Sequence, residues 1–591
     1  MKNSPHSFHI PVMGTGFTMD SPLRVARYGI DSVVSLGDDI LMEKMRRHYC
    51  QAAGLPFEPI ENGSEDNRAR RITAWLNFMD DQIRAQSLSL QLSPIHPGSE
   101  LWRYYSLLPD GPLKSSWQRM LSLAEGPDKW DLEASLRLKA VPGHIDVNVM
   151  TKVDRAFKAN GEPLPDGTDA LTGLRGFAKS RLDATVVFSA GMNPRLYGSL
   201  TAFDDFFPDK KGFIKKRVCL KVSDYRSAEI QGRFLAKKGI WVSEFRFESG
   251  LNCGGHAFAP QGQLFGPILE EFSSKRSALR DELFMIWSQA LASRRSGPFP
   301  DEPPVRFSVQ GGVGRAAEQR LLIERYRADS VGWGTPFLLV PEATAVDAEH
   351  RKKLCEAGEA DVELSDASPL GIPFWSLKTS SSEALRLRRI AEGHPGSPCG
   401  QAYLTFDTEF GPNPLCSSSR AYQKKKIEAL EALGLPPQQL EAAKAVVLGH
   451  ACICVDLGGG AANALGIKEQ AAVAVCPGPN IAWFDREASL EEMVGHIYGR
   501  NSLLSEKSSV ERPHMFLTEL KLSVDFMARE MRRTALGLSP RASRYFEEYR
   551  KNLEDGIRYY LRQGQGLFGG KDAWLQQKLT SMMTPAGASL S

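Results

Sequence analysis

The chain has 591 residues, which is too long for one ordinary domain and predicts a large core with additional regions. Lysine and arginine total 73 against 70 aspartate and glutamate residues, and this balance argues against nucleic acid or an anionic membrane as a partner. No apolar run reaches the length of a bilayer span, and the first residues lack the apolar segment of a signal peptide. We therefore expect a cytoplasmic protein whose nine cysteines serve as thiols, metal ligands or core residues rather than disulfides.

The first 36 residues predict a strand, a short helix and a second strand. Residues 8–13 form an apolar run that ends at Gly-Thr-Gly. A helix begins at Ser21-Pro22, with proline at its first position, and ends at Gly29. Residues 30–36 are again apolar and predict the second strand.

Residues 38–144 interrupt this alternation of strands and helices. Helical periodicity appears over 40–52 and 72–84, and residues 101–123 contain further helical sequence with several tryptophans and tyrosines. We interpret the whole stretch as a helical insertion after the second strand. Two roles are open for it, a cover over a binding site or a packing subdomain without chemistry.

The strand-helix alternation then resumes and continues to residue 345. Six more strands are predicted, at 145–150, 184–189, 217–222, 240–247, 305–310 and 330–334. Eight strands with helical sequence between most of them predict an α/β fold, a parallel (β/α)₈ TIM barrel formed by residues 1–37 and 145–345.

Glycines follow the last two predicted strands. Gly311, Gly312 and Gly314 follow the seventh strand and precede a helix, and Gly334 and Thr335 follow the eighth strand. Glycine turns at the start of a helix expose backbone amides that bind phosphate, and the last two strands of this barrel type form a phosphate pocket. The sequence therefore predicts that these two turns bind a phosphate together.

Residues 346–487 form a cysteine-rich extension. Five of the nine cysteines fall within residues 399–476; they are Cys399, Cys416, Cys452, Cys454 and Cys476. Cys399 and Cys476 stand beside glycine or proline. Three interpretations are open: a [4Fe-4S] cluster, a structural zinc ion, or unligated thiols. On a strand, Cys452 and Cys454 would face the same side, so that either one could complete a set of four ligands.

The end of the chain, residues 488–591, is predicted to be mostly helical, with helices at 490–498, 515–536 and 540–562. Arginine, glutamate and tyrosine alternate along the last helices, which indicates packing against the barrel or against a second copy in a homo-oligomer. Earlier in the extension, residues 454–462 look like a strand that runs into a tight glycine turn.

Several of these segments, taken in order, resemble one family. They are Pro11-Val12-Met13-Gly14, Val147-Asn148-Val149, Cys253-Gly254-Gly255-His256, Gly311-Gly312-Val313 and the segment 332–337. They are similar to motifs of the flavin-dependent nitronate monooxygenases, also called 2-nitropropane dioxygenases, a group that includes flavin-dependent enoyl-acyl-carrier-protein reductases. The resemblance covers residues 8–343, apart from the insertion.

The resemblance implies FMN at the carboxyl end of the barrel, with its phosphate on the two glycine turns. It places Gly14 and Asn148 against the flavin ring and makes His256 the acid/base or substrate-orienting group, which suits imidazole chemistry beside a flavin. The other interpretation of His256 is a loop histidine that caps a turn. Cys253 departs from the family pattern; it is either a thiol facing the flavin or a small buried residue.

The favoured function is reduction of an activated carbon–carbon double bond by hydride transfer from FMN. Two alternatives are a nitronate monooxygenase that uses dioxygen, and a non-catalytic flavin- or phosphate-binding subunit of a larger complex. The substrate is expected to be a small molecule or an acyl group. The reductant is open between NAD(P)H and an electron-carrier protein such as ferredoxin, which could act through the iron–sulfur cluster.

Overall fold

The computed structural model describes residues 4–151, 154–158, 160–255, 261–294, 302–398, 401–468, 470–506 and 511–568. Its centre is a closed barrel of eight parallel strands, in which β8 pairs with β1. The strands are β1 (Phe8–Ile10), β2 (Asp31–Ser35), β3 (Ile145–Val149), β4 (Ala184–Phe188), β5 (Lys216–Val222), β6 (Val242–Glu248), β7 (Arg306–Gln310) and β8 (Ser330–Gly332). The predicted TIM barrel is confirmed.

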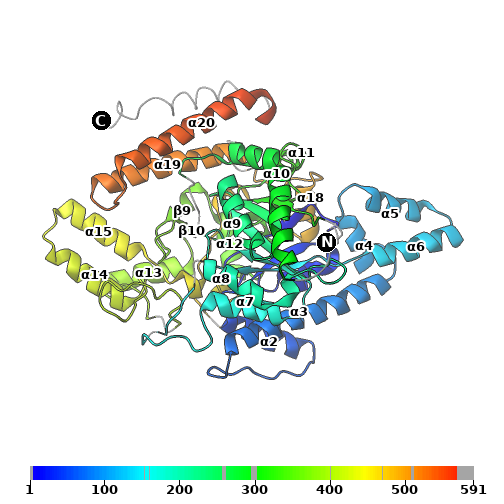
Figure 1. Cartoon of the computed structure of the whole chain (residues 1–591), viewed down its shortest axis with the longest axis horizontal. Coiled ribbons are helices and arrows are strands. Elements are labelled where there is room, and N and C mark those ends of the chain that lie inside the picture. The colour runs from blue at the N-terminus through cyan, green and yellow to red at the C-terminus, as the bar shows by residue number, and fades with distance from the viewer. Residues whose placement is uncertain are drawn as a thin grey trace.

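Helices connect the strands and surround the barrel. The connecting helices are α1 (Ser21–Val25), α7 (Asp169–Lys179), α8 (Pro194–Ser199), α9 (Tyr225–Ala236), α10 (Phe265–Ala292) and α11 (Ala316–Glu324). Between β2 and β3 lie α2 (Asp39–Ala52), α3 (Asn67–Leu92), α4 (Glu100–Leu107), α5 (Pro112–Ser122) and α6 (Pro127–Lys139). These five helices confirm the helical insertion, and α4 to α6 project at one end of the molecule (Figure 1).

The region after the barrel is also mostly helical, as predicted. Its helices are α12 (Ala348–Glu356), α13 (Ser381–Ala391), α14 (Arg420–Ala432), α15 (Pro437–Gly449), α16 (Ile453–Asp456), α17 (Gly459–Ala464), α18 (Leu490–Ile497), α19 (Met515–Ala535) and α20 (Ser543–Leu567). A small antiparallel sheet pairs β9 (Val362–Ser365) with β10 (Phe374–Leu377). Helices α14 and α15 lie at the end opposite the insertion, and α19 and α20 lie along one side (Figure 1). Within the described residues, no helix combines the length and the apolar character needed to cross a membrane.

Alternation along β6 explains how the barrel is packed inside and outside. Phe245 and Phe247 contact Phe272 of α10, on the outside of the barrel. The residues that alternate with them, Glu244 and Arg246, are buried and form an ion pair of 2.8 Å. Because side chains alternate along a strand, the acidic and basic residues of β6 point into the barrel.

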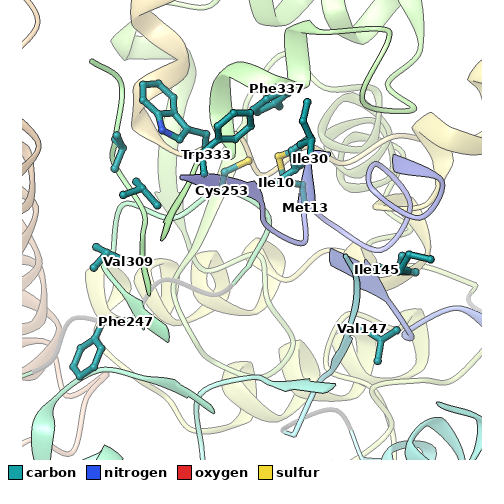
Figure 2. Packing of buried hydrophobic residues seen from close by; sticks show 14 of the residues in the cluster. Ile10, Met13, Ile30, Ile145, Val147, Phe247, Cys253, Val309, Trp333 and Phe337 are labelled. Carbon is teal, nitrogen blue, oxygen red and sulfur yellow. The ribbon is translucent and has the colours of Figure 1, made fainter. Parts of the chain in front are cut away.

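One large hydrophobic cluster joins the outer faces of the strands to the surrounding helices. Figure 2 shows part of it, with Ile10, Met13, Cys253 and Trp333 near the pairing of β1 with β8. Continuous apolar packing of this kind fixes the strand ends at the mouth of the barrel, where loops carry the polar groups.

Two local predictions in the extension are wrong. The segment with Cys452 and Cys454 is not a strand, because Cys452 caps α16 and Cys454 lies within it. The glycine run that follows is the start of α17 rather than a tight turn. A Cβ atom on Gly460 would lie 2.5 Å from the ring of Phe17, so the glycine permits close packing of this helix on the loop after β1.

Candidate functional site

Four of the five residues predicted to bind a phosphate line one cavity at the carboxyl ends of β7 and β8. This glycine cavity has an empty volume of about 270 Å³. It is lined by Pro11, Asn252, Cys253, Gln310, Gly311, Gly312, Val313, Gly332, Gly334 and Thr335. The structure therefore brings together two turns that are separated by a strand and a helix in the sequence.

The turn after β7 needs its glycines. Gly311 and Gly312 have φ values of +102° and +87°, a backbone conformation that other residues rarely adopt. A Cβ atom would lie 2.6 Å from Ser249 Oγ at Gly311 and 2.7 Å from Leu251 Cδ1 at Gly312. Within the described part of the chain, the amides of Gly311, Gly312 and Gly334 donate to no backbone carbonyl and no side chain. These donors match the oxygens of a phosphate.

Two predicted phosphate contacts already have partners. The Gly314 amide donates to Glu318 Oε2 at 2.8 Å, so a carboxylate of α11 occupies the start of its own helix. The Thr335 hydroxyl donates to the carbonyl of Pro477 at 2.6 Å. Gly314 and the Thr335 side chain thus hold the turns in place, and their direct contact with a phosphate stays a prediction.

A larger opening, the mouth cavity, lies over the centre of the barrel with an empty volume of about 960 Å³. Its barrel side includes Val12, Gly14, Thr15, Asn148, Lys221, Glu248, Gly254 and Gly255. Its other side comes from the extension and includes Leu370, Phe374, Tyr403, Leu404, Ile453, Cys454 and Leu457. Gly14 and Asn148, which the family resemblance places against the flavin, therefore line the same cavity.

A buried ion pair forms the floor of the mouth cavity. Lys221 Nζ at the end of β5 lies 3.2 Å and 3.1 Å from the two carboxylate oxygens of Glu248 at the end of β6. Gln310 donates a further hydrogen bond to Glu248 at 2.5 Å. Burial raises the pKa of Glu248, but the charge of Lys221 and hydrogen bonds from Asn252, Lys221 and Gln310 outweigh it and lower the pKa below its usual value. Glu248 is therefore ionised at neutral pH and holds the ammonium group of Lys221 at the cavity.

Several buried polar atoms around these cavities have no hydrogen-bond partner within the described residues. They are Asn148 Oδ1, Thr15 Oγ1, Asn252 Oδ1 and Gln310 Oε1. Leaving a buried polar atom unpaired costs about 1–3 kcal/mol, so four of them around adjoining cavities indicate a site built for a polar ligand. Together with the unpaired glycine amides, they fit a ligand that has both a phosphate group and a polar ring.

The predicted catalytic residue, His256, lies outside the described residues, and its role stays a prediction. Gly255, immediately before it, lines the mouth cavity. Cys253 in the same loop is buried, and its thiol donates to the carbonyl of Cys476 at 3.2 Å. Burial raises the pKa of the Cys253 thiol well above its usual value, which favours the interpretation of this residue as a buried thiol that packs beside the turn.

The structure does not bring the predicted cysteine ligands together as it does the glycine turns. Cys399 lies outside the described residues. Among the described residues, no three of the other candidates, Cys416, Cys452, Cys454 and Cys476, come close enough to hold one metal ion. Burial raises the pKa of Cys476 to about 12. The described thiols alone do not fit a four-cysteine centre, and the iron–sulfur cluster stays a prediction.

One group of three potential metal ligands does occur, formed by Asp347, Glu349 and His350 at the start of α12. Their hydrogen bonds explain the group without a metal. His350 Nδ1 lies 2.9 Å from Asp347, and its Nε2 accepts from the Ser381 amide at 3.2 Å. Glu349 pairs with Lys353 at 2.6 Å. The group therefore caps helices α12 and α13.

Sequence reasoning missed Lys221 and Glu248. Lys221 lies within the predicted strand 217–222, and Glu248 directly follows the predicted strand 240–247; both strands are otherwise mainly apolar. A charge near the carboxyl end of a barrel strand is a signal of function that could have identified them. It could not have identified Tyr403 or Leu404 as cavity residues, because the extension carries no repeat that places it over the barrel.

Comparisons with known proteins give a limited result. No family model matches the chain, and no curated protein matches it. Among solved structures, the chain is similar to the enoyl reductase domain of MlnA from the macrolactin biosynthesis cluster of Bacillus amyloliquefaciens. The two chains are 15% identical, with a TM-score of 0.31, and the match covers 72% of this chain and 93% of that one.

Proposed function

We propose that the protein is an FMN-dependent oxidoreductase that reduces an activated carbon–carbon double bond. One observation carries the proposal: three glycine amides that have no acceptor among the described residues surround a cavity at the ends of β7 and β8. This cavity lies beside a mouth cavity with a charged floor. This is the position at which barrels of this type bind phosphate-bearing ligands. The polar floor next to it provides for chemistry on the rest of such a ligand.

In this proposal, the amides of Gly311, Gly312 and Gly334 bind the phosphate of FMN. Asn148 and Thr15 each have a buried oxygen that accepts from no donor in the described part of the chain. Both line the mouth cavity, where they would contact the ring. FMN supplies a ring that accepts and donates hydride. The residues of the chain hold that ring, orient the substrate beside it and exclude water.

Reduction of a double bond adds a hydride to one carbon and a proton to the other. Lys221 carries protons at Nζ, lines the mouth cavity and is held by Glu248, so we assign it as the described group that can supply the proton. Its positive charge also stabilises negative charge that develops on the substrate as the hydride arrives. His256 remains the second proposed proton donor.

The side of the mouth cavity that the extension supplies points to the substrate class. Phe374, Leu404, Ile453 and Leu457 are apolar, whereas the barrel side carries the charged pair. An apolar chain with a polar, activated end, such as an unsaturated acyl group, matches both sides. We propose an acyl substrate on this basis, with NAD(P)H or a carrier protein as the source of electrons.

The proposal can be tested without knowing the natural reductant. The protein is incubated with FMN, freed of unbound flavin, reduced chemically without air, and mixed with an α,β-unsaturated acyl thioester. We expect bound flavin that becomes oxidised as the saturated thioester forms in equal amount. Failure to retain FMN would overturn the proposal, and oxygen uptake with a nitronate but no thioester reduction would favour the monooxygenase alternative.

Lys221→Met provides the variant that tests the assigned proton donor. It should retain FMN but lose about 10²-fold or more in the rate of thioester reduction, the range that general acids contribute. Lys215→Met is the control. Lys215 directly precedes β5, so it lies at the opposite end of the strand from Lys221, and it pairs with Asp205 at 2.9 Å. Equal rates in both variants would remove Lys221 from the mechanism.

A further inference from the structure

A buried arginine from the C-terminal region contacts the turn after β7. The Arg512 side chain is 2% exposed and precedes α19. Its Nη2 donates to the Gly312 carbonyl at 2.6 Å, and its Nη1 donates to Glu318 Oε1 at 2.7 Å. Its Nε and Nη2 donate to Asn480 Oδ1 at 3.0 Å and 2.8 Å. Arg512 therefore connects the glycine turn, helix α11 and the extension.

Glu318 is the centre of the same network. Its side chain is also 2% exposed, and it accepts hydrogen bonds from the amides of Gly314 at 2.8 Å, Arg315 at 3.1 Å and Met515 at 2.8 Å. Burial alone would raise the pKa of Glu318, but the charge of Arg512 and these hydrogen bonds lower it. The pair is therefore ionised inside the protein.

These contacts fix two consecutive peptide groups of the turn. Arg512 binds the carbonyl of the peptide between Gly312 and Val313. Because C=O and N–H point in opposite directions in a trans peptide, the Val313 amide points away from Arg512. In the next peptide, Asn480 donates to the Val313 carbonyl at 2.9 Å while Glu318 accepts from the Gly314 amide. Val313 lines the glycine cavity.

A turn of this composition needs such restraint. Gly311 and Gly312 both have positive φ, and glycine loses more backbone freedom on ordering than any other residue. A turn that binds a phosphate through several amides must hold them in one orientation before the ligand arrives, or else part of the binding free energy is lost in ordering it.

We propose that Arg512 and Glu318 are a positioning pair for the phosphate turn, so that the C-terminal region is a required part of the cofactor site. The inference rests on the proposed function, because it takes the glycine turn as the site of the FMN phosphate. Neither side chain needs to contact the cofactor. Arg512 acts through the Gly312 carbonyl, and Glu318 acts through the Gly314 amide.

The pair differs from an ordinary buried ion pair in what its loss should change. A buried ion pair contributes little net stability compared with apolar side chains of similar size. A contribution to stability therefore does not explain why Arg512 and Glu318 are paired at this position. A positioning role predicts a specific loss of phosphate recognition. FMN and riboflavin share the ring and differ by the phosphate, and therefore separate the two effects.

The experiment measures the dissociation constants of FMN and riboflavin by quenching of flavin fluorescence. In the Arg512→Lys variant and in the double variant Arg512→Met/Glu318→Gln, we expect FMN to bind roughly tenfold or more weakly while riboflavin binds within about twofold of wild type. The double variant leaves no unpaired buried charge, and lysine preserves the charge without the planar fork of arginine. Unfolding curves establish that the variants are folded.

Arg71→Met is the matched control. Arg71 is equally buried and has the same kinds of partner, a carboxylate of Asp39 at 2.9 Å, the carbonyl of Ile60 and the amide oxygen of Asn62 at 2.6 Å. It lies in the insertion, so the ratio of FMN to riboflavin affinity should stay unchanged. A folded Arg512 variant with wild-type FMN affinity, or equal weakening of both flavins, would overturn the inference. Failure of the wild-type protein to bind either flavin would instead reject the proposed function.

Discussion

The barrel and the parts of the chain that follow it, the extension and the C-terminal region, contribute different things to the mouth of the barrel. The barrel supplies the charged pair Lys221–Glu248 and the glycine turns, on the ends of strands that are held by a closed hydrogen-bond ladder. The extension supplies apolar cavity walls, and the C-terminal region supplies the arginine that fixes a turn. Under the proposed function, the chemistry would take place on the barrel residues, whereas the shape of the cavities depends on both parts of the chain.

This division leads to a clear expectation about mutations. Loss of a barrel group at the mouth should remove chemistry and leave buried charges unpaired. Loss of a contact in the C-terminal region should change fit or local order, and its effect should shrink with distance from the mouth.

The largest effect on stability is expected for Lys221→Met. Lys221 and Glu248 are each 8% exposed, so the variant leaves a buried carboxylate without its cation. Breaking a buried pair in this way costs about 3–5 kcal/mol, measured as the free energy of unfolding in urea. Lys221→Met/Glu248→Gln should recover most of that stability but not turnover. A loss below about 1 kcal/mol in the single variant would contradict the burial of the pair.

The next largest effect is expected for Gly312→Ala. Alanine at a φ of +87°, with its Cβ atom 2.7 Å from Leu251, should destabilise the fold by about 2–4 kcal/mol and weaken FMN binding.

Gly434→Ala is the matched control for that turn. Gly434 in the extension has a φ of +64°, and no described atom lies within 4 Å of an added Cβ atom. Alanine there should therefore cost only the backbone strain of the left-handed conformation, about 1–2 kcal/mol. The free energies of unfolding of both variants are measured in urea. Equal losses in the two variants would mean that the contact of the added methyl group with Leu251 contributes nothing.

The same division explains which parts of the structure could be predicted from the sequence. All eight barrel strands were predicted, because buried parallel strands are short apolar runs that alternate with amphipathic helices. The short helix α16 was predicted as a strand, because a run such as Cys-Ile-Cys-Val is apolar in either conformation. Its position at the mouth of the barrel, where Ile453 and Cys454 line the cavity, has no local signal in the sequence.

Prediction of the site follows the same pattern. Gly311, Gly312, Gly334 and Thr335 could be predicted to come together, because equivalent ends of neighbouring barrel strands are adjacent by topology. Arg512 could not, since it lies 200 positions from the Gly312 carbonyl that it binds and no periodic pattern connects them. Contacts made by single side chains between loops leave no local signal in the sequence.

A third prediction concerns pH and the contact of α19 with the start of α10. Burial raises the pKa of Glu519 to about 8, partly offset by a hydrogen bond from the Phe265 amide. The folded protein then binds a proton that the unfolded chain releases above its ordinary pKa of 4.5. Stability should therefore fall as pH rises from about 4.5 to about 8, by up to ~1.4 kcal/mol per pH unit, and then level off.

Glu519→Gln isolates this contribution, because glutamine still accepts the hydrogen bond but does not titrate. The difference in unfolding free energy between wild type and variant, followed across this pH range, should change in favour of the variant as pH rises. A difference that is constant with pH would show that Glu519 is ionised in the folded protein.

The smallest effect is expected at the periphery of the C-terminal region. Arg533 of α19 pairs with Asp366 at 2.8 Å, and the two side chains are 22% and 35% exposed. Partly exposed pairs contribute about 0–1 kcal/mol and are screened by salt, so Arg533→Ala should lower stability by less than about 1 kcal/mol and by even less in 1 M salt. FMN affinity should not change. If Arg533→Ala weakened FMN as strongly as the Arg512 variants do, the C-terminal region would act on the site as one rigid unit. The inference that the C-terminal region affects FMN binding only through the contacts of Arg512 and Glu318 with the glycine turn would then be wrong.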